Sequence, residues 1–120
     1  MATIMTVDDT ASMRQMISFT LNSVGHKVIE AADGKEALDL AHENKVDLVI
    51  ADINMPNMDG IELVRSLRNL QDYKLTPILM LTTESQTAKR QEGKSAGATG
   101  WIVKPFNPDQ LVAIVNKVVG

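Results

Sequence analysis

Acidic, hydroxyl and amine side chains stand directly after several short apolar runs of this chain. These residues are Asp8 and Asp9, Asp52, Thr82, and Lys104. Short apolar runs bounded by turn residues are typical of buried strands. If the strands are parallel, their carboxyl ends meet at one edge of a sheet, where open α/β folds place their ligands. We therefore expect these side chains to share one pocket at that edge.

The expected pocket would gather three carboxylates, which repel one another. Two carboxylates about 4 Å apart repel by roughly 4 kcal/mol at an effective dielectric of 20, so the group needs a cation. The candidate ligands are all oxygens, and a hard ion such as Mg²⁺ suits them. Lys104 would add a second positive charge. Such a pocket could hold a phosphoryl group while Asp52 attacks it as a nucleophile and forms an aspartyl phosphate.

The elements that must position these residues alternate between strand and helix patterns. Strands are expected at residues 4–7, 27–31, 48–51, 78–81 and 101–103. The first helical pattern ends at Gly25, and the next two helices open with an aspartate cap, at Asp33 and Asp59, each followed by glutamate three residues on. Asn107 is expected to cap the last helix. The helix expected at residues 85–96 is mostly polar, and we predict that it is the least stable regular element.

Five alternations of strand and helix predict the α/β class, with parallel strands and helices on both faces of the sheet. We take the strand order 2-1-3-4-5 of a doubly wound, flavodoxin-like sheet from known folds, because the sequence does not supply it. In that order the first and third strands are neighbours. Asp8 and Asp9 would then lie beside Asp52.

Length and composition limit the possible classes of function. The chain has 120 residues and a net charge of −3, with 44% hydrophobic and 22% charged residues and no cysteine. These values predict one globular domain over residues 1–120 and exclude thiolate catalysis and disulfides. The negative charge argues against nucleic acid or an anionic membrane as a partner. No secretory signal or bilayer-spanning run is evident, so we expect a cytoplasmic protein.

The dispersed motifs resemble one family over nearly the whole chain. The segment Asp52-Ile53-Asn54-Met55-Pro56-Asn57-Met58-Asp59-Gly60 and the segment Lys104-Pro105-Phe106 are similar to those of receiver domains of two-component response regulators, and closest to the single-domain chemotaxis regulators. The resemblance implies that Asp52 accepts a phosphoryl group from the phosphohistidine of a histidine kinase. It also implies a signalling switch without an output domain of its own, rather than an enzyme with a separate substrate.

The same resemblance assigns roles to the other residues of the site. It implies that Asp9 binds Mg²⁺ directly, that Asp8 acts mostly through water, and that Asn54 contributes its backbone carbonyl, with Asp52 also part of the metal site. Thr82 and Lys104 would contact the phosphoryl oxygens, and the peptide bond between Lys104 and Pro105 would be cis. Trp101 would be the switch aromatic that turns inward as Thr82 moves. Asn54 and Glu84 would tune dephosphorylation.

Two departures from the chemotaxis regulators bear on the partner. Trp101 stands where those proteins carry tyrosine, and residues 86–89 lack their paired lysines. We expect a monomer whose phosphorylated form presents the weak helix, the fifth strand and the last helix to a downstream effector protein. The flagellar motor switch is one candidate effector.

Other readings of the same residues stay open. A phosphorelay intermediate would use the same chemistry. An aspartate-nucleophile phosphatase would need a second carboxylate two residues after the nucleophile, where Asn54 stands. A flavodoxin-like cofactor binder would need a glycine-rich phosphate loop after the first strand, where Asp8 and Asp9 stand instead.

Overall fold

A five-stranded parallel sheet forms the centre of the molecule. Its order is β2-β1-β3-β4-β5, which confirms the predicted order. The strands are β1 (Thr3–Val7), β2 (Lys27–Ala31), β3 (Leu48–Asp52), β4 (Ile78–Thr83) and β5 (Gly100–Lys104). The computed structural model describes residues 1–83 and 87–119.

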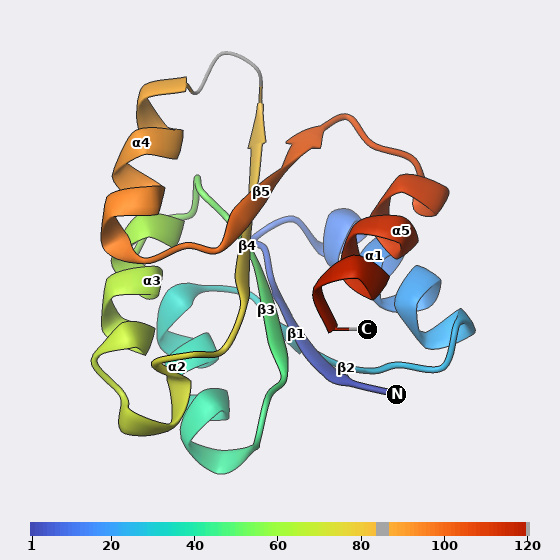
Figure 1. Ribbon diagram of the computed structural model, residues 1–120, viewed down its shortest axis with the longest axis horizontal. Coiled ribbons are helices and arrows are strands. Elements are labelled where there is room, and N and C mark those ends of the chain that lie inside the picture. The colour runs from blue at the N-terminus through green and yellow to red at the C-terminus, as the bar shows by residue number, and fades with distance from the viewer. Residues whose placement is uncertain (84–86, 120) are drawn as a thin grey trace.

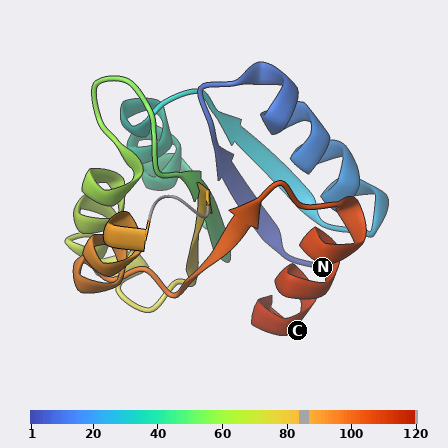
Figure 2. The same cartoon turned by 90° about the horizontal axis from the view of Figure 1, so that it is seen from above.

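Helices cover both faces of this sheet. They are α1 (Ala11–Ser23), α2 (Gly34–Glu43), α3 (Gly60–Arg68), the short 3₁₀ helix η1 (Gln71–Tyr73), α4 (Thr87–Ala96) and α5 (Pro108–Val119). In Figure 1, α1 and α5 lie on one side of the sheet and α2, α3 and α4 on the other, and the view from above in Figure 2 shows the same division. None of the described helices is long and apolar enough to cross a membrane.

The two helix layers enclose two separate hydrophobic cores. The core on the side of α2, α3 and α4 includes Met5, Val49, Leu63 and Met80, and the core on the side of α1 and α5 includes Ile4, Ile17, Ile50 and Leu111. Neighbouring residues of one strand enter opposite cores, as the period of two in a strand requires. Every residue of β3 is buried, so the central strand is covered on both faces, as is usual for a parallel sheet.

The predicted helix starts are confirmed in detail. The side chains of Asp33 and Asp59 accept hydrogen bonds from the backbone N–H groups three residues on, at 2.8 and 2.9 Å. Asn107 and Gln110 bond each other's backbone N–H groups at 2.8 and 2.9 Å, which forms a capping box at α5.

Several predicted boundaries are wrong by one or two residues. Asp52, Thr82 and Lys104 were expected to follow their strands, but they belong to them. The ladder hydrogen bonds continue to the edge of the sheet, so composition alone places the strand ends too early. Helix α4 begins at Thr87, and the first residues of the predicted helix, 85 and 86, lie outside the described residues. The short helix η1 was not predicted.

Arg68 joins three segments at the amino-terminal end of the sheet. Its Nε donates to the carbonyl oxygen of Gly97 at 3.0 Å, and its Nη1 donates to those of Tyr73 and Thr76 at 2.6 and 2.7 Å. Tyr73 and Thr76 precede β4, and Gly97 precedes β5. Burial lowers the pKa of Arg68, but a guanidinium stays protonated at ordinary pH, so the side chain acts as a fixed cationic clamp.

Candidate functional site

The register of the sheet brings the predicted acidic residues together. In the pairing of β1 with β3, Val7 lies opposite Ala51, so Asp8 and Asp52 come next at the same level. One carboxylate oxygen from each of Asp8, Asp9 and Asp52 lies within 4.8 Å of the other two. The shared acidic pocket expected at the carboxyl edge of the sheet is therefore present.

Asp52 stands at the centre of this pocket with both of its oxygens engaged. Its side chain is buried, with a relative exposure of 9%. Oδ2 lies 2.9 Å from the Nζ of Lys104, and Oδ1 accepts the backbone N–H of Asn54 at 3.1 Å. A charge-assisted hydrogen bond of this length holds both partners in a defined position. Lys104 thus reaches Asp52 from the end of β5, two strands away.

Asp8 is fully buried, and only part of its carboxylate is satisfied. Oδ1 accepts the backbone N–H of Thr10 at 2.8 Å, whereas Oδ2 has no hydrogen-bond partner within residues 1–83 and 87–119. Burial is the main cause that raises the pKa of Asp8; the charge of Asp52 adds to this, and the bond from Thr10 and the charge of Lys104 oppose it.

The donor set fits a hard divalent cation. A buried carboxylate oxygen without a partner is costly unless a cation or a proton neutralises it, and Asp8 Oδ2 is such an oxygen. Asp9 and Asp52 supply two more oxygens within reach. Mg²⁺ takes few protein carboxylates and keeps several waters, so Asp8, Asp9 and Asp52 are the residues that would hold it.

Thr82 and Trp101 lie on the two neighbouring strands at this edge. Thr82 is fully buried on β4, and its hydroxyl has no hydrogen-bond partner in the described part of the chain. Thr82 pairs with Val103, one residue before Lys104. Trp101 is half-buried on β5 and packs against the core on the side of α2, α3 and α4. Glu84, predicted to tune dephosphorylation, lies outside the described residues.

The loop after β3 borders the pocket. A shallow hollow of about 440 Å³ is lined by Asp9, Asn54, Met55, Pro56 and Asp59. Asn54 is exposed, and its backbone N–H bonds Asp52 as described above. The loop returns tightly, because the N–H of the residue that opens α3, Gly60, donates to the carbonyl oxygen of Ile53 at 2.9 Å.

Gly60 is required by this close return. A Cβ atom at this position would collide with the carbonyl oxygen of Asp52 and with the backbone of Ile53. Glycine allows backbones to approach in this way. On the other side of the pocket, the peptide bond between Lys104 and Pro105 is cis, as the resemblance implied.

Two residues that support Asp8 were not predicted from the sequence. Besides Thr10, the side chain of Arg14 donates from Nη1 to the carbonyl oxygen of Asp8 at 2.6 Å. Arg14 lies in the first turn of α1, six residues after Asp8. That spacing could have suggested a contact with the end of β1, but no pattern in the sequence singles out this arginine.

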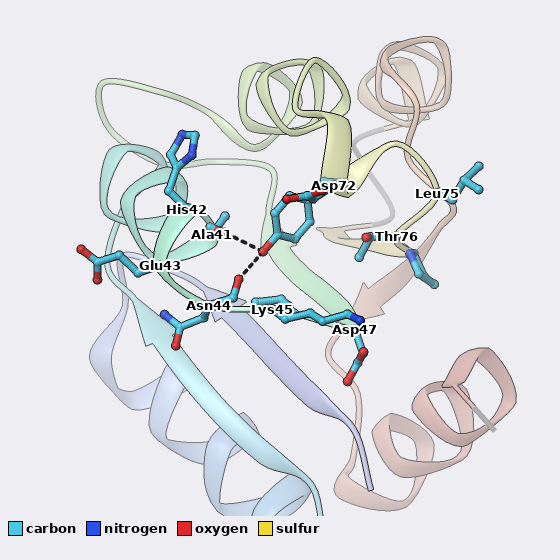
Figure 3. A pocket seen from close by; sticks show the side chains of 12 residues that line it. Ala41, His42, Glu43, Asn44, Lys45, Asp47, Asp72, Leu75 and Thr76 are labelled. Atoms are coloured by element: carbon cyan, nitrogen blue, oxygen red, sulfur yellow. Dashed lines mark hydrogen bonds between the residues drawn. The ribbon is translucent and has the colours of Figure 1, made fainter.

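A second pocket lies away from these residues, at the other end of the sheet. It has a volume of about 790 Å³ and lies between the end of α2 and the segment that includes η1. Figure 3 shows two hydrogen bonds within it: the hydroxyl of Tyr73 lies 2.7 Å from the carbonyl oxygen of Ala41 and 2.6 Å from that of Asn44. None of the predicted site residues lines it.

Comparison with known families and sequences gives one consistent result. Residues 4–116 match the response regulator receiver domain. A chemotaxis protein CheY homolog of Campylobacter jejuni is 42% identical over 119 residues, which cover 98% of this chain and 92% of that protein. A probable transcriptional regulator, ycf27, of Guillardia theta is 40% identical over 116 residues, which cover 97% of this chain and 44% of that protein. The chain thus spans less than half the length of the latter relative.

Solved structures agree with the sequence relatives. The chemotaxis response regulator CheY4 of Vibrio cholerae superposes with a TM-score of 0.94 at 52% identity, covering 98% of both chains. A response regulator of Chloroflexus aurantiacus, described as putative, superposes with a TM-score of 0.93 at 35% identity, covering 98% of this chain and 97% of the other.

Proposed function

This chain belongs to the response regulator receiver domain family, and we propose that it is a phosphorylation-activated switch of a two-component system in which Asp52 accepts the phosphoryl group. The observation that carries the proposal is the placing of Asp52 between the Nζ of Lys104, at 2.9 Å, and the carboxylates of Asp8 and Asp9. A nucleophilic carboxylate, a fixed ammonium and oxygen ligands for Mg²⁺ are the parts that phosphoryl transfer needs.

In the proposed reaction an oxygen of Asp52 attacks the phosphorus of a phosphohistidine on a histidine kinase. The new O–P bond forms as the N–P bond breaks, and the leaving imidazole takes a proton from solvent. Bound Mg²⁺ would neutralise charge on the phosphoryl oxygens. Lys104 stabilises one of these oxygens from the β5 side, which requires its ammonium to exchange part of its contact with Asp52. Asp8, Asp9 and Asp52 would hold the ion, with Asn54 contributing its backbone carbonyl.

The proposed response to phosphorylation runs through β4 and β5. The hydroxyl of Thr82 would turn to a phosphoryl oxygen, and Trp101 would follow it inward. These changes would alter the face formed by α4, β5 and α5, which a downstream effector would recognise. The buried, unpartnered hydroxyl of Thr82 and the half-buried ring of Trp101 support this part of the proposal. Asn54 and Glu84 would set the lifetime of the phosphoryl group.

We propose chemotaxis as the pathway, with the flagellar motor switch as a candidate effector. Support comes from the relatives of nearly the same length, the CheY homolog of Campylobacter jejuni and CheY4 of Vibrio cholerae. In this proposal the chain is a single receiver domain, monomeric and cytoplasmic. The phosphorelay intermediate is the alternative within the family. A phosphatase with a separate substrate is less well supported, because residue 54 is an asparagine and not a carboxylate.

Labelling by acetyl phosphate tests the central claim. Wild-type protein with Mg²⁺ should gain one phosphoryl group by intact-mass spectrometry, and Asp52→Asn should gain none, because an amide is not a nucleophile here. Asp39→Asn is the matched control, since Asp39 is an exposed residue of α2, and it should be labelled like wild type. Persistent labelling of the peptide around residue 52 in Asp52→Asn would refute the assignment.

A further inference from the structure

We propose that Arg14, steadied by Glu30, is a positioning residue that fixes the backbone of Asp8 so that the acidic pocket is preformed for Mg²⁺. The inference rests on the proposed function, because it assigns a role toward the metal of that site. Arg14 would not touch the ion. It would act through the peptide that joins Asp8 to Asp9.

The guanidinium of Arg14 connects the residue that follows β1 with a residue of β2. Nη1 donates to the carbonyl oxygen of Asp8 at 2.6 Å, and Nε lies 3.5 Å from Oε1 of Glu30, which belongs to the edge strand β2. A planar guanidinium can direct different N–H groups to two partners at once, whereas a lysine ammonium is a flexible point charge. The Arg14 side chain is only 18% exposed, so its geometry is held by its surroundings.

The bond from Arg14 completes the fixing of Asp8. The backbone N–H of Asp8 donates to the carbonyl oxygen of Ala31 at 3.1 Å. Its Oδ1 accepts the N–H of Thr10, and its carbonyl oxygen accepts Nη1 of Arg14. Oδ2 is then the one polar atom of Asp8 without a hydrogen-bond partner in the described ranges 1–83 and 87–119. Three polar atoms of Asp8 are thus fixed by hydrogen bonds, and one of its carboxylate oxygens lies within 4.8 Å of a carboxylate oxygen of Asp9 and of Asp52.

Charge alone gives Arg14 the opposite role, and this makes the inference testable. A cation near the pocket repels Mg²⁺, so its removal should strengthen metal binding if only Coulomb forces act. If Arg14 acts by position, its removal should weaken metal binding despite the loss of a positive charge. Outer-shell partners of metal ligands typically contribute 10- to 100-fold to metal affinity. The pair with Glu30, whose side chain is 41% exposed, would add little stability by itself.

Isothermal titration calorimetry, which measures the dissociation constant for Mg²⁺ at fixed ionic strength, tests the inference. We expect Arg14→Gln to raise the dissociation constant about tenfold. Arg14→Lys, which keeps the charge but loses the two-way geometry, should give a smaller rise. Glu30→Gln leaves the bond to Asp8 in place and should give the smallest rise. Arg65→Gln, at an exposed position of α3, removes the same charge elsewhere and should stay within twofold of wild type.

Thermal unfolding without metal separates positioning from folding. A merely structural role would lower the melting temperature of Arg14→Gln while its folded fraction binds Mg²⁺ with unchanged affinity, and that result would overturn the inference. So would Mg²⁺ binding by Arg14→Gln that equals or exceeds that of wild type. If Arg14→Gln does not fold, the rise in Arg14→Lys decides. Wild-type protein that binds no Mg²⁺ would overturn the proposed metal site and this inference with it, a result distinct from failure of the arginine variants alone.

Discussion

The two ends of the sheet differ in whether their buried polar groups have hydrogen-bond partners. At the carboxyl end, Asp8 Oδ2 and the hydroxyl of Thr82 have no hydrogen-bond partner in the described chain. At the amino end, the guanidinium of Arg68 bonds three carbonyl oxygens, and the hydroxyl of Tyr73 lies within bonding distance of two. Unsatisfied buried polar groups are rare and call for an explanation. We infer that the amino end maintains the fold, whereas the carboxyl end gives up stability in order to bind ligands.

Substitution of Arg68 should have the largest effect on stability. Arg68→Met keeps the unbranched apolar part of the side chain but leaves three carbonyl oxygens without their donor. Hydrogen bonds to charged groups contribute about 1.5–3 kcal/mol each, and they are not additive, so we expect a loss of roughly 3 kcal/mol in the free energy of unfolding by urea denaturation. Arg65→Met, at an exposed position of the same helix, should change stability by less than about 0.5 kcal/mol. A loss below about 1 kcal/mol in Arg68→Met would break the comparison at its stable end.

Tyr73→Phe should have the next largest effect. The substitution removes one donor facing two carbonyl oxygens near the end of α2, at a cost of about 1–1.5 kcal/mol near neutral pH. Burial raises the pKa of Tyr73 in the folded state. The unfolded chain therefore ionises first as pH rises past the ordinary tyrosine range. The neutral phenol therefore contributes fully to the free energy of unfolding below the ordinary tyrosine pKa. This contribution is lost as pH rises through the raised pKa of the folded state. The difference in the free energy of unfolding between wild type and Tyr73→Phe should shrink from neutral to alkaline pH. A difference that stays constant over this range would contradict the prediction.

Asp8→Asn should have a smaller effect, of opposite sign, that depends on pH. Burial raises the pKa of Asp8 in the folded state. The protonated side chain therefore contributes fully to folding stability below the ordinary aspartate pKa. This contribution is lost as pH rises through the raised pKa. Without metal, Asp8→Asn should therefore melt a few degrees above wild type at pH 7. The difference should vanish in acid, where Asp8 is protonated in both states.

Saturating Mg²⁺ should reverse that order, because the metal stabilises only the protein that binds it. Calorimetric melting with and without Mg²⁺ gives both comparisons. An Asp8→Asn variant that is less stable than wild type without metal would show that the acidic pocket costs the fold nothing.

Thr82→Val should change stability least. The side chains have the same shape, and valine removes a buried hydroxyl that has no partner in the described chain, so the free energy of unfolding should equal that of wild type or rise by up to about 1 kcal/mol. A loss above about 1 kcal/mol would mean that the hydroxyl is bonded in solution. The contrast with Tyr73→Phe, which also removes one hydroxyl, is then the sharpest measure of the difference between the two ends.

The sequence was sufficient for the carboxyl end because the chemistry there is marked by position. Asp8, Asp52 and Lys104 each occur where an apolar run ends, and parallel strands must bring such ends together. The caps at Asp33 and Asp59 were equally predictable, since a cap and its partner lie three residues apart.

The amino end was not predictable because its interactions join distant segments. The three acceptors of Arg68 lie up to 29 residues away, and any carbonyl can serve as an acceptor, so no residue type marks them. The same holds for Arg14, whose partners are Asp8, just after β1, and Glu30 on β2. Strand ends were misplaced for a related reason, because backbone pairing continues through polar residues when the neighbouring strand does.

The fit of Gly60 against Asp52 limits where a change at the pocket can spread. Since even one methyl group cannot be inserted between the start of α3 and the backbone of residues 52 and 53, these two segments must move as one piece. A bulky group attached to Asp52 therefore finds no slack on that flank. We expect the displacement it causes to be taken up instead by β4, whose Leu81 pairs with Asp52.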